Sequence, residues 1–218
     1  MESKSSSRIR NERLPPSERP RVVVATGNPG KLREYTMFLD GSGFEAVPYD
    51  AGVDETGASY EENAVLKAEA ARDATGLPAI GDDAGVELDA LGGFPGLRSA
   101  RLAPTQAERT AELLKRLAPF PRPWLAKFVA ALALAAPGRA TVVVRGERPG
   151  EVIPEWRGTV GFGYDPVFLI PEDGRTFGEM EPDEKGLWSH RGAAFRKLRE
   201  THLLDELKAL RTNASASS

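Results

Sequence analysis

The sequence contains no cysteine among its 218 residues. This absence excludes a disulfide framework, a thiolate zinc site and a cysteine nucleophile, and it is typical of a protein kept in a reducing compartment. No segment approaches the run of about 20 apolar residues that a membrane span requires. The polar N-terminal stretch also lacks the apolar centre of a signal peptide. We therefore expect a cytoplasmic protein that has no membrane partner.

Positive charge is not in excess either, since the formal net charge is −3. A broad electropositive surface for long nucleic acids is therefore not expected. An RNA-binding module is also opposed by the lack of a basic, aromatic-rich pair of strands. We expect no nucleic-acid partner, and any anionic ligand must be met by a local cluster of cations.

Hydrophobic patterning predicts alternating strands and helices. Residues 21–26 read as a strand, followed by a Gly-Asn-Pro-Gly turn and a helix. Ser59 with Glu62, and Thr105 with Glu108, form capping boxes that start two further helices. The alanine-rich run from Trp124 fits a helix or a strand, and the turn after it favours a strand. Other strands are expected in FEAVPY, LPAI, VELDAL, ATVVVRG and DPVFLI.

This alternation predicts an α/β or α+β domain built on one sheet. A long final helix is expected from about Ser189, with an apolar side that includes Phe195, Leu204 and Leu210. No internal repeat or linker divides the chain. We expect a single domain over residues 21–211, with disordered tails at residues 1–20 and 212–218.

The stretch ATGNPGKL (residues 25–32) is similar to a phosphate-binding P-loop but is not one. Ala25 stands at the first glycine position and Leu32 at the position after the lysine. A glycine-flanked loop that opens a helix still presents backbone N–H groups and a positive dipole end to an anion, and Lys31 adds a charge. The same residues equally fit a strand-to-helix turn with a solvated lysine.

Two adjacent acids, Asp82 and Asp83, lie between the strands expected in LPAI and VELDAL. Acids in a turn are usually solvated. They also suit a hard metal ion, because Mg²⁺ takes one or two carboxylates and completes its shell with water and phosphate oxygens. A catalytic dyad is a third interpretation, opposed by the alternation of side chains along a strand.

Other polar residues are informative only in combination. Glu55 is a loop acid, and Asn63 and Lys67 lie four residues apart, so that they share one face of a helix. Phe162 and Tyr164 lie in the glycine-rich stretch GFGYDPVF (residues 161–168), which we call the aromatic loop. This loop suits stacking on a planar base as well as a buried turn.

A second combination lies at the start of the final helix, where Ser189, His190 and Arg191 follow one another. The N–H groups and dipole at a helix start favour an anion or a carbonyl acceptor. A single histidine is more often structural or solvated, and His202 is interpreted in that way.

Five stretches in order make the sequence resemble the inosine/xanthosine triphosphate pyrophosphatase family, the HAM1-like enzymes that act on non-canonical purine nucleotides. They are ATGNPGKLREY, ETGASYEENAVLKA, GDDAGVELDALGGFPGLRSAR, GFGYDPVF and EKGLWSHRGAAF. The resemblance implies a mixed α/β fold, with a long central mixed sheet, flanking helices and two lobes around a nucleotide cleft. It also implies a homodimer and Mg²⁺-dependent hydrolysis of ITP, dITP and XTP to the monophosphate and pyrophosphate.

The resemblance also implies roles for individual residues. Asp83 is the expected base that activates water, and together with Glu55 it is an expected Mg²⁺ ligand. Lys67 is expected to be catalytic, and Lys185 with Lys67 to contact the phosphates. The remaining residues are expected to bind substrate: the loop Thr26, Gly27, Asn28, Pro29, Gly30 and Lys31 the phosphates, Ala84 through its backbone, Phe162 by stacking, Gly163, Tyr164 and Asp165 around the base, and His190 and Arg191 at its 6-oxo edge.

Two features depart from the family pattern. Ala84 stands where a serine or threonine is usual, so that a side-chain hydroxyl contact is lost, and PEWRG replaces a PRG-like approach to the aromatic loop. The glycines after Asp83 let the chain turn through GGFPG and return Ser99 and Arg101 toward the cleft, as a hypothesis about placement. Donors aimed at a 6-oxo group reject the amino group of adenine, whereas guanine shares the 6-oxo group and its rejection requires a further contact.

Two alternatives remain. A Maf-like dTTP/UTP pyrophosphatase has the same general fold, and the SHR and GFGYDP stretches count against it. A protein that senses triphosphates without hydrolysing them has no need of a water-activating acid, so Glu55, Asp83 and the two lysines disfavour it.

Overall fold

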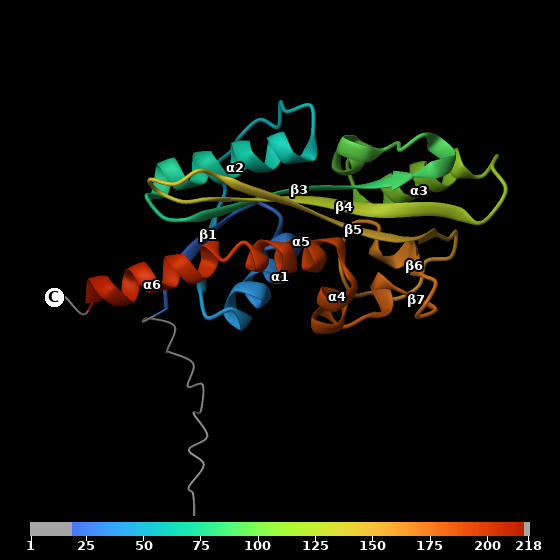
Figure 1. Ribbon diagram of the computed structural model, residues 1–218. Helices are drawn as coiled ribbons and strands as arrows, with labels where there is room; N and C mark the ends of the chain where they lie inside the picture. The colour runs from blue at the N-terminus through green and yellow to red at the C-terminus, as the bar shows by residue number, and fades with distance from the viewer. Residues whose placement is uncertain (1–18, 216–218) are drawn as a thin grey trace, which may run out of the picture.

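The computed structural model describes residues 19–215, which form a seven-stranded mixed sheet covered by helices on both faces (Figure 1). The strand order is β2-β1-β3-β4-β5-β6-β7, with β1 parallel to β2 and β3 and the other pairs antiparallel. The predicted mixed α/β class with a central sheet is confirmed. The strands are β1 (Arg21–Ala25), β2 (Glu45–Tyr49), β3 (Ala79–Leu88), β4 (Trp124–Ala135), β5 (Val142–Val152), β6 (Phe168–Ile170) and β7 (Arg175–Thr176).

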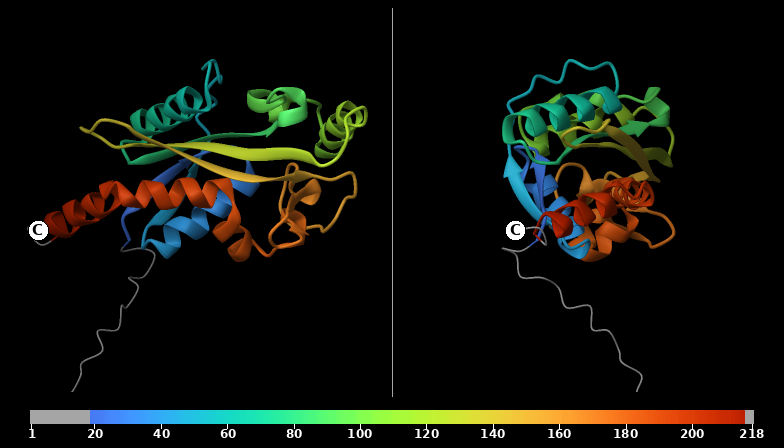
Figure 2. Two further views of the ribbon diagram at one scale, coloured as in Figure 1. Left: turned by 45° about the vertical axis from the view of Figure 1, so that its right-hand side comes forward. Right: turned by 60° about the vertical axis from the view of Figure 1, so that its left-hand side comes forward.

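The helices lie in two layers, one on each side of the sheet, and both layers are visible in Figure 2. One layer holds α2 (Tyr60–Thr75), η3 (Gly96–Arg101) and α3 (Gln106–Leu117). The other holds α1 (Pro29–Gly41), α4 (Pro182–Trp188), α5 (His190–Glu200) and α6 (Leu203–Ser215). Shorter 3-10 turns are η2 (Asp89–Leu91), η4 (Asp165–Val167) and η5 (Phe177–Glu179).

The long strand β4 forms the centre of the hydrophobic core. Its small residues Ala131 and Ala133 pack against Ala64 and Ala68 of α2, whereas Leu132 contributes to the core on the opposite face. Alanine on the α2 side lets the helix approach the sheet closely, and the pairing of β4 with β3 and β5 supplies its backbone hydrogen bonds. The strand that we predicted for this alanine-rich run is confirmed.

The prediction of two strands meeting at Asp82 and Asp83 was wrong, because β3 is one continuous strand from Ala79 to Leu88. It pairs with β4 along its whole length, from Ala79 opposite Ala135 to Leu88 opposite Ala126. The two acids and their flanking glycines read as a turn in the sequence. Pairing with a long, buried neighbour outweighs that local preference.

The predicted long final helix is divided in two. Helix α5 ends at Glu200 and α6 starts at Leu203, and between them His202 has a left-handed backbone conformation with φ 59°. Phe195 and Leu204 are buried on the predicted apolar side, whereas Leu210 lies beyond the described side chains. The stretch DPVFLI is also divided, since its first three residues form η4 and only the last three form β6.

The ends of the domain differ slightly from the prediction. Arg19 and Pro20, assigned to a tail, contact the domain, since Arg19 pairs with Asp40 and the Pro20 carbonyl accepts a hydrogen bond from Glu45 N. Helix α6 extends to Ser215. Residues 1–18 and 216–218 lie outside the described part of the chain, where the prediction of disordered tails is not addressed. Within residues 19–215, no helix has the length and apolar character needed to span a lipid bilayer.

Candidate active site

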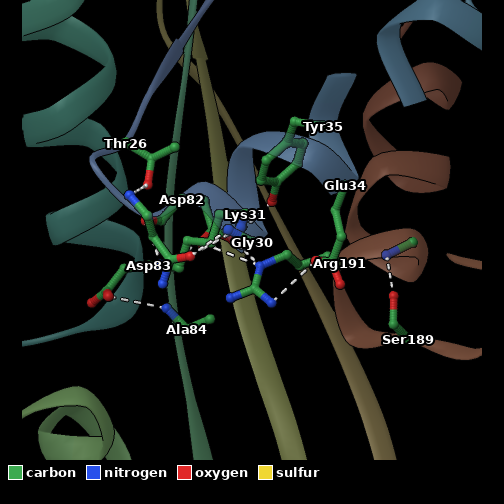
Figure 3. A network of polar contacts seen from close by, with 12 residues as sticks. Thr26, Gly30, Lys31, Glu34, Tyr35, Asp82, Asp83, Ala84, Ser189 and Arg191 are labelled. Atoms are coloured by element: carbon green, nitrogen blue, oxygen red, sulfur yellow. Dashed lines mark hydrogen bonds and ion pairs between the residues drawn. The ribbon is translucent and has the colours of Figure 1, made fainter. Parts of the chain in front are cut away.

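Asp82 and Asp83 are buried in the middle of β3 and point toward opposite layers of helices (Figure 3). Asp82 accepts a hydrogen bond from Tyr35 of α1, whereas Asp83 accepts one from Asn63 of α2. This arrangement follows from the alternation of side chains along a strand. A shared dyad of the two acids is therefore excluded by their orientation.

Asp83 belongs to a polar group on the α2 face. Asn63 Nδ2 donates to Asp83 Oδ2 at 2.9 Å, and Lys67 Nζ lies 3.7 Å from Asp83 Oδ1 and 2.8 Å from Glu55 Oε1. We call Glu55 and Asp83 the carboxylate pair. Helix α2 comes this close because Gly81 faces it, and a Cβ there would overlap the backbone of the helix. The structure thus brings together the predicted base, both predicted metal ligands and one predicted phosphate-binding lysine.

The surroundings of the carboxylate pair shift the two pKa values in opposite directions. Burial raises the pKa of Asp83 above its ordinary value, against the opposing charge of Lys67. Burial also acts to raise the pKa of Glu55, but its hydrogen bond to Lys67 and the charges of Lys67 and Arg101 outweigh burial and lower it. Two carboxyl groups whose pKa values are shifted in opposite directions suit separate roles. Asp83 is the stronger base of the two, and Glu55 is the more readily ionised.

The carboxylate pair fits the donor set of a hard divalent cation. Both carboxylates already converge on one positive charge, the ammonium of Lys67. In residues 19–215, no three histidine, cysteine, aspartate or glutamate side chains form a group that could enclose a metal. Mg²⁺ is commonly bound through one or two carboxylates together with water and substrate phosphates. The residues present therefore fit Mg²⁺ held jointly with a phosphorylated ligand.

On the opposite face, Asp82 begins a chain of buried ion pairs. Lys31 Nζ lies 2.6 Å from Asp82 Oδ2, and Arg191 Nε lies 3.3 Å from Asp82 Oδ1. Arg191 and Lys185 both contact Glu34, at 3.3 and 2.7 Å, and Lys185 also contacts Asp165 at 2.6 Å. We call this set the buried ion chain; its members are Lys31, Asp82, Arg191, Glu34, Lys185 and Asp165.

Neighbouring charges stabilise the ionised forms of Asp82 and Lys185 within the buried ion chain, whereas burial lowers the pKa of Lys31 and raises the pKa of Asp165. Burial alone would raise the pKa of Asp82, but Arg191 and Lys31 outweigh it and hold that pKa well below its usual value. Burial acts to lower the pKa of Lys185, and the charges of Asp165 and Glu34 outweigh it, so that the pKa is raised. Both groups therefore stay charged near neutral pH. The chain links α1, β3, α5, α4 and η4, which come from distant parts of the sequence.

The predicted phosphate loop has the expected strand-loop-helix geometry, but its N–H groups are not all free. Asn28 Oδ1 accepts hydrogen bonds from the N–H groups of Gly30 and Lys31, and Pro29 has no N–H group to offer. Thr26 Oγ1 accepts from Asn28 N at 3.1 Å. Two of the N–H groups that the sequence offers to an anion are therefore capped by the Asn28 side chain, and the predicted phosphate binding stays a prediction. The helix dipole and Lys31 remain as attractions for an anion.

Phe162, the predicted stacking residue, lies over this loop. A Cβ at position 30 would overlap the Phe162 ring, so that only glycine allows the aromatic loop and the phosphate loop to touch. The Lys185 ammonium lies 4.6 Å from the ring centroid, and the Arg191 guanidinium 5.2 Å. Phe162 is only partly buried, so that ring surface remains available to a ligand.

The other residues of the aromatic loop hold its shape. Gly163 has φ +65°, a left-handed conformation that glycine adopts without strain. Asp165 is buried, and its carboxylate accepts from the N–H of Phe162 at 2.7 Å while also contacting Lys185. Tyr164 is buried in the core and its hydroxyl donates to the Ser99 carbonyl at 2.9 Å. In this structure Tyr164 anchors η3, and its predicted contact with a base stays a prediction.

His190 and Arg191 start α5, where Ser189 Oγ accepts a hydrogen bond from Gly192 N. His190 is buried and stacks on Phe128, with ring centroids 4.7 Å apart. Its Nδ1 has no hydrogen-bond partner in the described part of the chain. Burial, with the charges of Arg191 and Lys185, lowers the pKa of His190 well below its usual value. The ring is therefore neutral and carries one unused polar atom.

Ala84 and the returning segment after β3 border the carboxylate pair. Ala84 N donates to Asp83 Oδ1 at 3.0 Å, so that the backbone is already used in holding the carboxylate. The chain does turn through GGFPG, and the Arg101 guanidinium forms an ion pair with Glu55. The returning segment thus places Arg101 beside Glu55, whereas the predicted nucleotide cleft stays a prediction. Ser99 lies under β3, where its hydroxyl accepts from Val86 N at 2.9 Å.

The sequence gives Glu34 and Tyr35 no functional role. Asp82 is a candidate there only together with Asp83, as a metal ligand or as half of a dyad, and the resemblance assigns it no role of its own. Glu34 lies one helical turn beyond Lys31, on the face that meets α5. Lys185 forms its ion pairs with Glu34 and Asp165 rather than with the carboxylate pair, so that its predicted phosphate contact stays a prediction.

The model of one protein family, the Ham1 family, matches residues 22–201, which include both polar groups described above. The chain belongs to the Ham1 family. Its match begins in β1 and ends just after α5, so that it includes every residue of the sheet except Arg21.

Other members of the Ham1 family are similar in sequence and in structure. The dITP/XTP pyrophosphatase of Gloeobacter violaceus is 47% identical over 179 residues, which cover 81% of this chain and 91% of that protein. The dITP/XTP pyrophosphatase of Thermus thermophilus is 44% identical over 189 residues, with 84% and 91% covered. The solved structure of a HAM1 protein from Coxiella burnetii has a TM-score of 0.73 at 36% identity, covering 84% of this chain and 98% of that one.

Proposed function

We propose that this Ham1 protein is a nucleoside-triphosphate pyrophosphatase that hydrolyses non-canonical purine triphosphates, of the dITP, ITP and XTP type, to the monophosphate and pyrophosphate. The observation that carries the proposal is the carboxylate pair around Lys67, whose ammonium lies 2.8 Å from Glu55 and 3.7 Å from the buried Asp83. Relatives at 41–47% identity are named dITP/XTP pyrophosphatase. Such hydrolysis removes abnormal nucleotides from the pool.

Asp83 is the proposed base. Its carboxylate is oriented by Asn63 at 2.9 Å and by the N–H of Ala84 at 3.0 Å, so that it is held in one position before substrate arrives. A raised pKa strengthens the carboxylate as a proton acceptor, because proton transfer from water becomes less unfavourable. Asp83 takes the proton from the water that attacks the α-phosphorus. The bond between the α-phosphorus and the bridging oxygen breaks, and pyrophosphate leaves with the electron pair.

Glu55 and Asp83 are the proposed ligands of Mg²⁺. When bound, the ion neutralises phosphate charge and lowers the pKa of water. Lys67 lies between the two carboxylates and keeps their mutual repulsion low in the free protein. On the phosphate side, Lys67 provides a charge that stabilises the developing negative charge of the leaving pyrophosphate.

Base recognition is assigned to the opposite group of residues. Arg191 is fixed by Asp82 and Glu34, so that little side-chain freedom is lost when it donates to a 6-oxo group. The unpaired Nδ1 of His190 offers a second polar atom at the same helix start. A 6-amino group would place a donor against the Arg191 guanidinium, and the resulting unpaired buried groups disfavour adenine. Phe162 supplies the stacking surface.

Three further features belong to the proposal rather than to the observations. The protein is proposed to act as a homodimer, to bind no nucleic acid and to work in the cytoplasm. The net charge of −3 and the absence of cysteine support the second and third features. Sedimentation velocity measures the first feature directly, and a monomer at micromolar concentration would contradict it.

The test of the proposed function is product analysis in the presence and absence of Mg²⁺. ITP, dITP and XTP are compared with ATP, GTP, CTP and dTTP, and pyrophosphate is scored against orthophosphate. We expect pyrophosphate and monophosphate from the first group only, and only with Mg²⁺. Reaction of pyrimidine triphosphates alone would refute the base assignment. No reaction with any triphosphate would leave the triphosphate-sensing alternative in its place.

A further inference from the structure

Arg101 is the most exposed cation at the carboxylate pair. Its side chain is 58% exposed, whereas that of Lys67 is 13% exposed. The two cations contact opposite oxygens of Glu55, with Lys67 at Oε1 and Arg101 at Oε2. Glu55 is thus bracketed by two positive charges in the free protein.

The backbone that carries Arg101 is firmly held. The Ser99 hydroxyl accepts from Val86 N at 2.9 Å, and the Ser99 carbonyl accepts from Tyr164 at 2.9 Å. Arg109 donates to the Ala100 carbonyl at 3.2 Å. Anchors from β3, the aromatic loop and α3 therefore fix the end of η3, and only the arginine side chain is free to move. An exposed, charged side chain on an anchored backbone suits a residue that changes its ion-pair partner.

The other cations near the site are tied to buried carboxylates. Those of the buried ion chain are at most 15% exposed, and each contacts one or two buried acids. Separating them from these acids would leave buried charges unpaired, which is costly. An exposed ion pair such as that of Arg101 contributes little to stability, so that exchanging its partner has a small cost.

We propose that Arg101 leaves Glu55 and binds the terminal phosphates of the substrate, and then the departing pyrophosphate. This inference rests on the proposed function and adds a residue to its phosphate site. If Glu55 serves as a ligand of Mg²⁺ at the polyphosphate, its oxygen Oε2 is no longer available to Arg101, and the nearest anion for the guanidinium would be the phosphate itself. A guanidinium donates two parallel hydrogen bonds to phosphate oxygens, which suits the terminal groups.

The experiment compares binding of two probes in the presence of Mg²⁺ by isothermal titration calorimetry. Inorganic tripolyphosphate reports on the terminal phosphates, and inosine monophosphate, which lacks them, reports on the base and first phosphate. We expect Arg101→Gln to weaken tripolyphosphate binding about tenfold or more while inosine monophosphate binds unchanged. Arg101→Lys should recover part of the loss. Arg98→Gln is the matched control, because Arg98 is an exposed arginine of η3 that forms no ion pair within residues 19–215.

Two results would overturn the inference: tripolyphosphate binding that is unchanged in Arg101→Gln, or an equal loss for inosine monophosphate. If either occurs while the wild-type protein still hydrolyses XTP, only the role of Arg101 fails. A wild-type protein that neither binds tripolyphosphate nor hydrolyses any triphosphate would refute the proposed function and this inference together. Thermal unfolding of each variant checks the fold, which the exposed position of Arg101 should leave intact.

Discussion

At the scale of single residues, the proposed base Asp83 differs from its neighbour Asp82 because the two side chains lie in different environments. Asp82 is surrounded by cations that keep it charged, whereas burial raises the pKa of Asp83 against the opposing charge of Lys67. Two identical side chains, adjacent in the sequence, therefore have different chemistry. The difference comes from the layer of helices that each one faces.

Asp83→Asn should abolish most hydrolysis and leave the fold unchanged. The amide oxygen can still accept from Asn63, but the amide cannot take a proton from water, so that kcat should fall by about two to four orders of magnitude. Steady-state kinetics with XTP measure the loss, and circular dichroism measures the fold. A folded variant with wild-type turnover would contradict the assignment of Asp83 as base.

His190 should make stability depend on pH. Its pKa is lowered in the folded state, so that below about pH 6.5 the unfolded chain gains a proton that the folded protein does not. Stability is therefore greatest above that pH and should fall by up to about 1.4 kcal/mol per pH unit below it. The neighbouring charges are those of Arg191, Lys185, Lys31 and Asp82.

Urea unfolding of His190→Gln at pH 7.5 and 5.5 tests this dependence. The variant should lose the histidine contribution to the pH slope, whatever its absolute stability. His202→Gln is the control, because His202 is exposed and should leave the wild-type slope in place. Identical slopes in His190→Gln and wild type would show that burial of His190 does not cause the dependence.

At the scale of elements, the packing of α2 on β3 determines how closely Asn63 and Lys67 approach the proposed base Asp83. Gly81 lies two positions before Asp83, on the same face of the strand, and α2 rests directly on it. The closeness of the helix brings Asn63 and Lys67 to the carboxylate. Gly81 of β3 therefore sets the distance between Asp83 on the same strand and the side chains of α2 that contact it.

Gly81→Ala should destabilise the protein by about 1–3 kcal/mol, because the added methyl group overlaps backbone atoms of α2 that cannot rotate away. Activity should fall as well, since α2 must move away from Asp83. Gly41→Ala at the end of α1 is the control, because its Cβ would meet no atom within 4 Å. Equal unfolding free energies for the two variants would show that α2 adapts without cost.

At the scale of the whole molecule, the buried ion chain holds together segments that are far apart in the sequence. It runs from Lys31, at the start of α1, to Asp165, in the aromatic loop, through residues of β3, α4 and α5. The proposed phosphate loop and the proposed base site are therefore parts of one connected network. A substitution that removes one charge of the buried ion chain should therefore also disturb the ion pairs of its neighbours.

Lys185→Met should cost about 3–5 kcal/mol of stability, because it leaves Asp165 and Glu34 buried without their cation. Lys127→Met is the matched control, since Lys127 also lies between two glutamates, at 3.4 Å from each, but at the surface. Its loss should cost less than about 1 kcal/mol. Chemical denaturation compares the two, and similar costs would contradict the importance of burial.

The helix caps and most strands could be predicted from the sequence, because they depend on neighbouring residues. Thr105 and Glu108 form their reciprocal cap, whereas only half of the predicted capping box at α2 is present. Ser59 accepts from Glu62 N, but the Glu62 carboxylate accepts from Ala58 N rather than from Ser59 N. The continuity of β3 could not be predicted, because the acids and glycines that suggest a turn are overruled by pairing with β4. The break at His202 could not be predicted either, because the apolar spacing of the helix continues across it.

The sequence by itself determined the class of the fold, the family and the identity of the candidate catalytic residues, since ordered motifs and local spacing carry that information. Only the tertiary structure decided which aspartate faces which layer, that Asn28 uses the N–H groups of the phosphate loop, and that Glu34 joins Arg191 to Lys185. These facts depend on contacts between distant segments. Burial and the resulting pKa shifts exist only once those segments have packed together.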